Sequence, residues 1–459
     1  MTKSASSESE LEAIHSELQE EKREFVAPAS KKSKLAVATR ALRHRNFQLF
    51  FSGQLISLVG TWMDTVAESW LVYRLTGSSL LLGTVAFCNQ IPVFLCAPIG
   101  GIVADRYNRH RIIIATQSLS MVVAFVLAVL TLTHRVQVWQ IMLLAACGGV
   151  INAFDIPARQ AFLIDMVGRE DLLNAIALNS SMFNGARIIG PAVAGIVVAA
   201  VGEGWCFMAN SVSYIAVITG LLLMKLAPRR EHERKTSPLE DIVNGFTFVR
   251  NTAPIRAILL MLGLVSLVGM PYAVLMPIFA AEVLHGGPKA LGILMGATGV
   301  GALLGAMSLA ARVGVKGLGR LIGYCAVGFG AALIAFSFSR TFWLSALLLI
   351  PAGFCMMVQM ASSNTLIQSM VPDTMRGRVM AVYSMMFMGM APFGGFFAGA
   401  IAHHIGAPYT VAMGGLACIA GALIYEMYLP KIRGKTRELI MAQGMAAGVP
   451  AQEVTRQGA

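Results

Sequence analysis

The stretch MVGREDLLNAIALNSSMFNGARIIGPAVAG, residues 166–195, has a second copy in the chain. Residues 370–399 read MVPDTMRGRVMAVYSMMFMGMAPFGGFFAG, and the two stretches share ten of thirty positions at a constant offset of 204 residues. The identical positions include Gly190 with Gly394 and Gly195 with Gly399. Two unrelated apolar segments would not share so many positions, so the chain is predicted to consist of two repeated halves.

The composition is that of a membrane protein. Of the 459 residues, 56% are hydrophobic and only 13% are charged, whereas soluble domains carry about 25% charged residues. A helix needs about 20 apolar residues to span the hydrocarbon. The other spanning structure, a closed β-barrel, needs an alternating pattern, and the apolar runs here are continuous. The sequence therefore predicts an all-α membrane protein.

Twelve apolar segments are predicted to be transmembrane helices, six on each side of a polar stretch. Both copies of the repeat are expected to run in the same direction, so the predicted fold has two parallel six-helix halves (6+6) related by a pseudo-twofold axis, which is a known transporter architecture. The predicted spans are 47–73, 80–104, 112–133, 138–164, 172–200, 205–226, 254–281, 288–312, 318–339, 342–367, 376–402 and 408–430. The predicted divisions are an N-terminal tail (1–46), a first half (47–226), a central loop (227–253), a second half (254–430) and a C-terminal tail (431–459).

The net charge of +12 follows the predicted topology. One alternating topology puts 31 of the 36 Lys and Arg residues on a single side of the membrane. The other five are Arg74, Arg135, Lys289 and Arg340 on the opposite side and Arg187 inside a helix. By the positive-inside rule both termini are expected in the cytoplasm. The basic balance thus fits a lipid bilayer, and no nucleic-acid partner is predicted. The seven cysteines are scattered singly, so no metal site is predicted.

Two acids interrupt the first span in TWMDTVAESW, residues 61–70. The polar residues of this span recur every three or four positions, at Gln54, Ser57, Thr61, Asp64 and Glu68. This spacing puts them on one helix face. A charge at the bilayer centre costs at least about 2.5–3.5 kcal/mol, so the face is predicted to line water or protein and not lipid.

Arg187 is expected near the middle of the fifth span, where a lone arginine needs a carboxylate. Asp64 is its candidate partner. Asp64 and Glu68 should not both stay ionised in a poorly solvated place, because burial and a neighbouring like charge favour the neutral form. Three interpretations stay open: proton coupling or cation binding by at least one acid, a structural pair with Arg187, and, at least for Glu68, a water-exposed position at a cavity mouth.

Several motifs resemble those of one transporter family. The segment GGIVADRYNRHR, 100–111, resembles the signature cytoplasmic loop of the major facilitator superfamily. The segment GARIIGPAVAG, 185–195, resembles its antiporter motif, built on Gly190, Pro191 and Gly195. HRNFQLFFSGQLISLVGTWM, DIPARQAF, GEGWCF and SSNTLIQSMVPDTMRGRV look like the drug and siderophore exporter branch, the enterobactin exporter-like group of proton antiporters. The resemblance covers roughly residues 40–430.

The resemblance implies a cytoplasmic gate around the 100–111 loop. Asp105 would face the start of the eleventh span near Arg376, where a helix N-terminus attracts an anion. Arg106 or Arg109 would pair with Asp155 or Asp165 of the fourth span. The residues assigned to the gate are Gly101, Asp105, Arg106, Arg109, Asp155 and Arg159.

The resemblance also implies that the first, fourth, seventh and tenth spans line a central cavity. The seventh, with Pro271 and Pro277, is nearly apolar. The residues predicted for the coupling site and substrate cavity are Asp64, Glu68, Arg187, Gln54, Thr61, Asn152, Gln359 and Asn364.

The function that the resemblance implies is secondary active transport in the inner membrane. A monomer would export an amphipathic small molecule, of drug or siderophore type, by proton antiport and alternating access. No cofactor is expected, because the chain has no G-x-x-x-x-G-K-[ST] motif and an ion gradient would supply the energy. Uptake or lysophospholipid flipping by the same fold is the alternative within transport. A membrane enzyme would need a clustered His/Asp or Ser/His set, and a transport-dead receptor would need a soluble signalling domain.

Overall fold

The computed structural model describes residues 40–168, 170–226, 238–312 and 314–446, and every regular element in these ranges is a helix. The predicted tails lie outside the described residues from 1 to 39 and from 447 to 459. The helices before the central segment are η1 (Arg40–Arg43), α3 (Arg45–Thr76), α4 (Ser79–Arg106), α5 (Arg109–Leu132), α6 (Val138–Val167), α7 (Leu172–Val201) and α8 (Glu203–Leu222).

The later elements are more irregular. They are α9 (Pro238–Asn251), α10 (Ala253–Leu264), η2 (Val265–Gly269), η3 (Met270–Ala273), α11 (Met276–Ile278), η4 (Phe279–Val283), α12 (Gly287–Ala310), α13 (Leu318–Phe338), α14 (Phe342–Met370), α15 (Asp373–Met388), α16 (Ala391–Ile405) and α17 (Ala407–Ala446).

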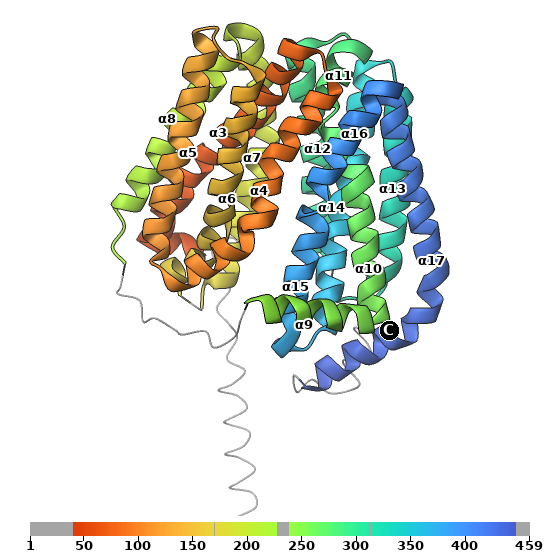
Figure 1. Cartoon of the computed structure of the whole chain (residues 1–459). Coiled ribbons are helices and arrows are strands. Elements are labelled where there is room, and N and C mark those ends of the chain that lie inside the picture. Colours follow the sequence, from red (N-terminus) through yellow and green to blue (C-terminus); the bar gives the residue numbers. More distant parts are fainter. Residues whose placement is uncertain (1–39, 169, 227–237, 313, 447–459) are drawn as a thin grey trace, which may run out of the picture.

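Eleven helical segments of the described chain are long and apolar enough to cross a membrane, so this is a multi-pass membrane protein. Helix α3 has 32 residues but is not among the eleven, because its polar residues lower its mean hydropathy. In Figure 1, α3–α8 stand together on the left and α10–α17 on the right. We call these two groups the N-terminal and C-terminal halves. We call the end of the bundle near Thr76 and Ser79 the outer end and the opposite end the inner end, after the predicted topology.

The repeat extends to the way the helices pack. In the N-terminal half α4 packs on α6, and a Cβ atom added to Gly149 would lie 2.1 Å from the carbonyl oxygen of Asn89. In the C-terminal half α12 packs on α14, and a Cβ atom added to Gly353 would lie 2.1 Å from the carbonyl oxygen of Thr298. Gly353 follows Gly149 at the offset of 204 residues found in the sequence. The same close backbone approach therefore occurs at equivalent places in both halves.

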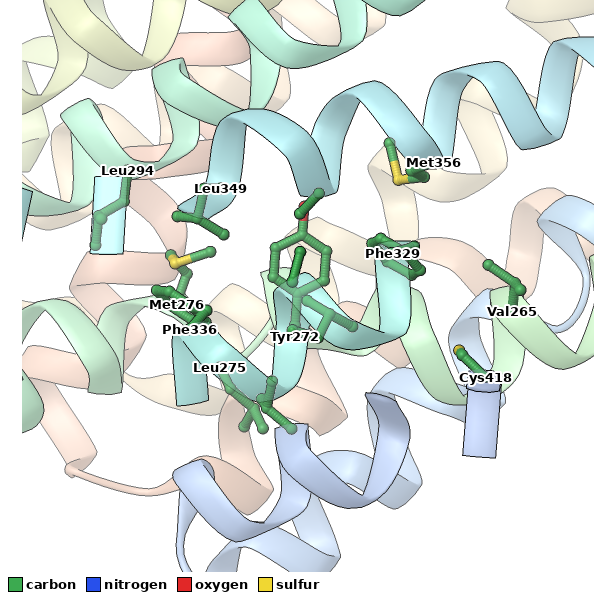
Figure 2. Close-up of a cluster of buried hydrophobic side chains, with 14 of the residues drawn as sticks. Val265, Tyr272, Leu275, Met276, Leu294, Phe329, Phe336, Leu349, Met356 and Cys418 are labelled. Carbon is green, nitrogen blue, oxygen red and sulfur yellow. The ribbon is translucent and has the colours of Figure 1, made fainter. Parts of the chain in front are cut away.

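The predicted seventh span, 254–281, is not one regular helix. It divides into α10, two π turns (η2 and η4), a 3-10 turn (η3) and the short α11. Pro271 and Pro277 have no N–H to donate, so each interrupts the helical hydrogen bonds. Irregular backbone is tolerated at membrane depth where protein buries it. Figure 2 shows this burial, with residues from η2, η3, α12, α13 and α14 packed around Tyr272 and Met276.

The central segment, predicted as a loop, contains the 14-residue helix α9. Val249 is buried, and a Cβ atom at Gly245 would lie 2.7 Å from the carbonyl oxygen of Arg378 on α15. Helix α9 is therefore held against the inner end of the C-terminal half, where it lies across the helices in Figure 1.

Helix α17 continues well past the predicted end of the last span at residue 430. Its 40 residues make about 60 Å at 1.5 Å per residue, twice the hydrocarbon thickness of about 30 Å. Beyond Pro430, Ile432 is buried and Leu439 packs against the core, while Lys431 and Lys435 are exposed. This amphipathic pattern explains why the helix continues along the surface at the inner end.

The halves meet along two pairs of helices, of which α4 with α16 is the first. A Cβ atom added to Gly83 would lie 2.6 Å from the carbonyl oxygen of Gly395. Nearer the outer end, the Ser79 hydroxyl donates a hydrogen bond of 3.0 Å to the carbonyl oxygen of Gly399. We call this contact the α4–α16 seam.

The second pair is α7 with α12. A Cβ atom added to Gly195 would lie 2.9 Å from the carbonyl oxygen of Pro288, and one added to Gly292 would lie 2.4 Å from that of Pro191. We call this contact the α7–α12 seam. Both seams depend on glycine, because no larger residue allows the backbones to approach so closely.

The inner end of the interface is different. Cβ atoms added to Gly101, Gly185 and Gly377 would meet no atom within 4 Å. On the inner part of α4, Leu95 and Ile99 are 63% and 54% exposed. The glycine contacts between the halves thus lie toward the outer end.

We expect Gly195→Leu to open the outer end, because overpacking a tight contact costs about 1–3 kcal/mol. The readout is the rate at which a membrane-impermeant maleimide, added outside, labels Cys in a Ser79→Cys background, since Ser79 is 6% exposed. The labelling rate should rise at least about fivefold, the effect of ~1 kcal/mol. Gly185→Leu, on the same helix with open space around it, is the control, and an equal rise in both variants would contradict the assignment.

Candidate functional site

Asp64 lies on the face of α3 that packs against α8. On that face a Cβ atom added to Gly60 would lie 2.7 Å from the Asn210 side-chain oxygen and 2.8 Å from the Ser213 hydroxyl. The Asn210 side chain also lies beside Asp64. The carboxylate oxygen Oδ1 of Asp64 is buried and has no hydrogen-bond partner among the described residues. Glu68, one turn toward the outer end, is half-buried.

The predicted polar stripe of α3 is only partly accessible. Thr61 is exposed, and its hydroxyl donates to the carbonyl oxygen of Ser57 at 3.0 Å. Gln54 and Ser57 are 2% and 1% exposed, so the prediction that Gln54 lines an open cavity is wrong for this conformation. The reason is the close packing of α3 on α8, where a Cβ atom at Gly53 would lie 2.9 Å from a backbone oxygen of α8.

The polar residues of the fourth and tenth spans also divide into accessible and buried ones. Asn152 on α6 and Asn364 on α14 are half-buried, and the Asn364 side-chain oxygen accepts a hydrogen bond from Gln368. Gln359 is 1% exposed and its amide nitrogen has no partner in the described chain. Gln359 is therefore packed inside the C-terminal half instead of lining an open cavity.

Arg187 does not form the predicted pair with Asp64. Its guanidinium carbon lies 5.7 Å from the centroid of the Trp62 ring, a cation–π contact worth about 0.5–2 kcal/mol depending on its hydration. Trp62 and Asp64 are two residues apart, which is about 200° around a helix, so a group packed on one cannot face the other. The prediction thus directed Arg187 toward the face of α3 that carries Asp64, whereas it packs on the face that carries Trp62.

The antiporter-motif helix α7 touches two neighbours through its glycines. Gly190 faces α3, where an added Cβ atom would lie 2.4 Å from the Cβ atom of Trp62. Gly195 and the backbone oxygen of Pro191 face α12 in the α7–α12 seam. This helix thus connects the Trp62–Arg187 contact in one half with the packing of the other half.

Arg109 is the centre of the contacts in the 100–111 loop. Its guanidinium donates to the carbonyl oxygen of Ala161 at 2.8 Å and lies 3.3 Å from Asp165 and 3.7 Å from Asp105. The pairing of Arg109 with Asp165, one of those implied by the resemblance, is therefore present. Arg106, in contrast, is exposed.

The implied contact of Asp105 with the start of α15 stays a prediction. Arg376, near that start, pairs with Asp373 on its own helix at 2.7 Å. Gly101 is half-buried with open space beside it. Of the predicted gate residues, Asp105 therefore lies at Arg109 together with Asp165 of α6.

Asp155 is buried inside the N-terminal half, at 2% exposure. Its oxygens accept hydrogen bonds from Thr116 at 2.8 Å and Gln117 at 2.9 Å on α5, and Arg159 lies 2.6 Å away. The implied pairing with Arg106 or Arg109 is replaced by this pairing with Arg159. The i,i+4 spacing favours it, because residues four apart on a helix are neighbours.

The sequence analysis missed the polar residues on α8, which packs against α3, and on α5, which packs against α8 and α6. Asn210, Ser213 and Tyr214 recur at three- and four-residue spacing in α8, and Thr116, Gln117 and Ser120 do the same in α5. This spacing is readable in the sequence as a polar face inside an apolar span. It also missed a contact between the halves at the outer end, where the Tyr73 hydroxyl donates to Glu282 at 3.1 Å.

Comparisons with known proteins point to one family. A family model described as a transmembrane secretion effector matches residues 36–454. The staphyloferrin A transporter of Staphylococcus aureus is 26% identical over 85% of this chain and 98% of its own length. The enterobactin exporter EntS of Citrobacter koseri is 24% identical over 85% and 93%. A bacterial homologue of the iron transporter ferroportin in an inward-facing state has the same fold, with a TM-score of 0.66 at 15% identity over 84% of this chain and 98% of that one.

We expect Asp155→Ala to destabilise the protein strongly, because it leaves the half-buried Arg159 without its carboxylate and leaves the buried Thr116 and Gln117 without an acceptor. Breaking a buried ion pair in this way costs about 3–5 kcal/mol. Thermal unfolding of the purified protein in detergent measures the loss. Asp165→Ala is the control, because its side chain is 29% exposed and exposed pairs contribute about 0–1 kcal/mol. Equal unfolding temperatures for the two variants would contradict this assignment.

Proposed function

Because the chain belongs to the transmembrane secretion effector family of the major facilitator superfamily, we propose that it exports an amphipathic small molecule by proton antiport. The family and the curated relatives are transporters, so the protein is a transporter and not an enzyme. Its substrate is proposed to be of drug or siderophore type, as the names of the staphyloferrin A transporter and the enterobactin exporter suggest.

The proposed membrane arrangement has twelve spans, with α3 added to the eleven apolar ones. Residues 47–226 and 254–430 then form two parallel six-helix halves joined by the central segment, and both termini lie in the cytoplasm. The support is the repeat at an offset of 204 residues and the equivalent glycine contacts at Gly149 and Gly353. We propose that one such chain, as a monomer in the inner membrane, is the working unit.

The transport cycle is proposed to alternate access by rocking one half against the other. The glycine seams at Gly83 and Gly195 hold the outer end together in this structure, while Arg376 stays on its own helix at the inner end. This combination fits a conformation closed toward the outside. In the opposite conformation the seams would separate and Asp105 would approach the start of α15.

The observation that supports proton coupling best is the environment of Asp64. Its Oδ1 is buried without a partner, and Arg187, the nearest candidate cation by sequence reasoning, is stacked on Trp62. A buried carboxylate oxygen without a partner is costly, so this environment favours the binding of a proton or a cationic group. Glu68, Thr61, Asn152 and Asn364 are the accessible polar residues proposed to face the substrate.

We expect Asp64→Asn and Glu68→Gln each to reduce pH-driven efflux to the level of vesicles without the protein. Neither amide can exchange a proton for substrate. Transport is measured in everted membrane vesicles across a panel of siderophores and cationic drugs, with the proton gradient present or collapsed by an ionophore.

Glu438→Gln, at an exposed position on α17, makes the same chemical change outside the site and should transport normally. Unchanged, gradient-dependent efflux in both the Asp64 and Glu68 variants would rule out coupling by this pair. Wild-type efflux that ignores the gradient would rule out proton antiport altogether.

A further inference from the structure

We propose that the N-terminal half contains its own proton path, which leads from Asp64 to Asp155 between α3, α5, α6 and α8 and is separate from the substrate route between the halves. The path rests on the proposed proton antiport and adds the side chains that carry the proton inward. It assigns a relay role to Tyr214, Ser120 and Thr116, and a proton-accepting role to Asp155.

The outer end of the path is the Asp64 carboxyl group. Asp64 points to α8, where it contacts Asn210, and not to Arg187. Its Oδ1 and the side-chain oxygen of Gln54, farther inward on α3, are both buried acceptors without partners in the described chain. Polar sites of this kind typically bind internal water. Asp64 therefore lies at the outer end of a polar region inside the N-terminal half.

The middle of the path is the Tyr214 hydroxyl. Tyr214 follows Asn210 by one turn of α8, so the two share a face, and it is 9% exposed. Its hydroxyl group lies near the hydroxyl groups of Thr61 on α3 and Ser120 on α5, and Asp64 and Asp155 also lie in its neighbourhood. Tyr214 thus stands between the two carboxyl groups.

The inner end of the path runs down α5 to Asp155. Thr116 precedes Ser120 by one turn, so their hydroxyls share a face, and Thr116 donates to Asp155 at 2.8 Å. Gln117 also donates to Asp155, at 2.9 Å, and its own oxygen is another buried acceptor without a partner in the described chain. Gln117 therefore positions Asp155, and the proposed path passes from Ser120 to the hydroxyl of Thr116 one turn away.

The path ends toward solvent at Arg159. The Arg159 side chain is 23% exposed while that of Asp155 is 3% exposed, so Arg159 covers the buried acid from the inner side. Asp64 from α3, Asp155 and Arg159 from α6, and Tyr214 and Cys206 from α8 are the titratable groups that face this region. Helix α5 contributes hydroxyl and amide groups.

The transfer conserves protons at every step. The protonated Asp64 gives up its O–H proton to the chain, and each hydroxyl accepts one proton while passing on its own. Asp155 gains one proton in total and loses its ion pair with Arg159, which then turns toward water. The proton leaves Asp155 for water at the inner end, and the Asp155–Arg159 pair forms again.

A separate path lets the proton leave Asp64 when substrate blocks the space between the halves. In an antiporter the proton and the substrate use the same central acid, so a bulky substrate arriving from the inner side would block the exit of the proton it displaces. A path inside the N-terminal half lets the proton leave while the substrate occupies the space between the halves. Substrate binding and proton release can then happen in one conformation.

The test variant is Tyr214→Phe, because it removes one relay oxygen without changing the charge or the ring. Tyr425→Phe is the matched control. Tyr425 is equally buried, at 5% exposure, in the C-terminal half, and its hydroxyl has no partner in the described chain. Asp155 itself is unsuitable, because its removal is expected to destabilise the fold.

Two transport modes of the purified protein in liposomes separate the roles, with ethidium, a lipophilic cation, as probe. Counterflow exchanges labelled for unlabelled probe without a gradient and needs no net proton transfer. Accumulation driven by a pH gradient needs one proton transfer per cycle. We expect Tyr214→Phe to keep counterflow within about twofold of wild type and to slow gradient-driven accumulation at least about tenfold, the rate effect of ~1.4 kcal/mol. Tyr425→Phe should leave both modes unchanged.

Each other outcome counts against the path. Normal gradient-driven accumulation by Tyr214→Phe would overturn it while leaving proton antiport intact. Equal loss of both modes would assign Tyr214 a structural role and overturn the relay. Wild-type counterflow without gradient-driven accumulation would overturn the proposed proton coupling, and the path with it. If the wild-type protein moves no ethidium in either mode, the exchange of protons for a lipophilic cation, on which the path rests, is overturned.

Discussion

The Asp64 carboxyl group is buried between α3 and α8, and one of its oxygens has no hydrogen-bond partner in the described chain. The surrounding spans are apolar, so a charged group here needs a partner that neutralises or solvates its charge. Arg187 is stacked on Trp62, Asp155 is paired with Arg159, and Arg109 is paired with Asp165. Each of these groups has found a local partner. Asp64 stands apart from them, and the proposed chemistry follows from that exception.

Glycine decides how the helices around these groups can approach. Within each half, glycines bring α4 onto α6 and α12 onto α14, and between the halves they form the two seams. Such contacts are short-ranged and need no side chains to interlock. A seam made of backbone can separate and close again without moving large side chains out of pockets. The rigid contacts inside the halves and the separable contacts between them are thus built from the same residue type.

The all-helical, multi-span character of this fold could be predicted from the sequence, because long apolar runs are a direct consequence of the bilayer. The repeat at an offset of 204 residues located equivalent helices, and the paired contacts of Gly149 and Gly353 agree with it. Helix α9 was taken for loop because its charged flank hides the apolar face that packs on α15. The sequence analysis noted the two prolines of the seventh span but did not predict that they divide it into several short helical elements.

The candidate site was predicted less well, because spacing gives the face of a helix but not what that face meets. Gln54 shares the polar stripe of α3 with Thr61, yet it is buried against α8. Arg187 was predicted near the middle of its span, but whether it meets Trp62 or Asp64 depends on the rotation of α7 relative to α3. The Arg109–Asp165 pair was among the predicted alternatives, because the resemblance covers the loop motif that contains Arg109.

Helix α9 also changes the mechanics of the whole molecule. At Gly245 the backbone of α9 lies against that of α15, so α9 must follow α15 in any rocking of the halves. The described part of the central segment therefore moves as a rigid extension of the C-terminal half and does not shift between the halves.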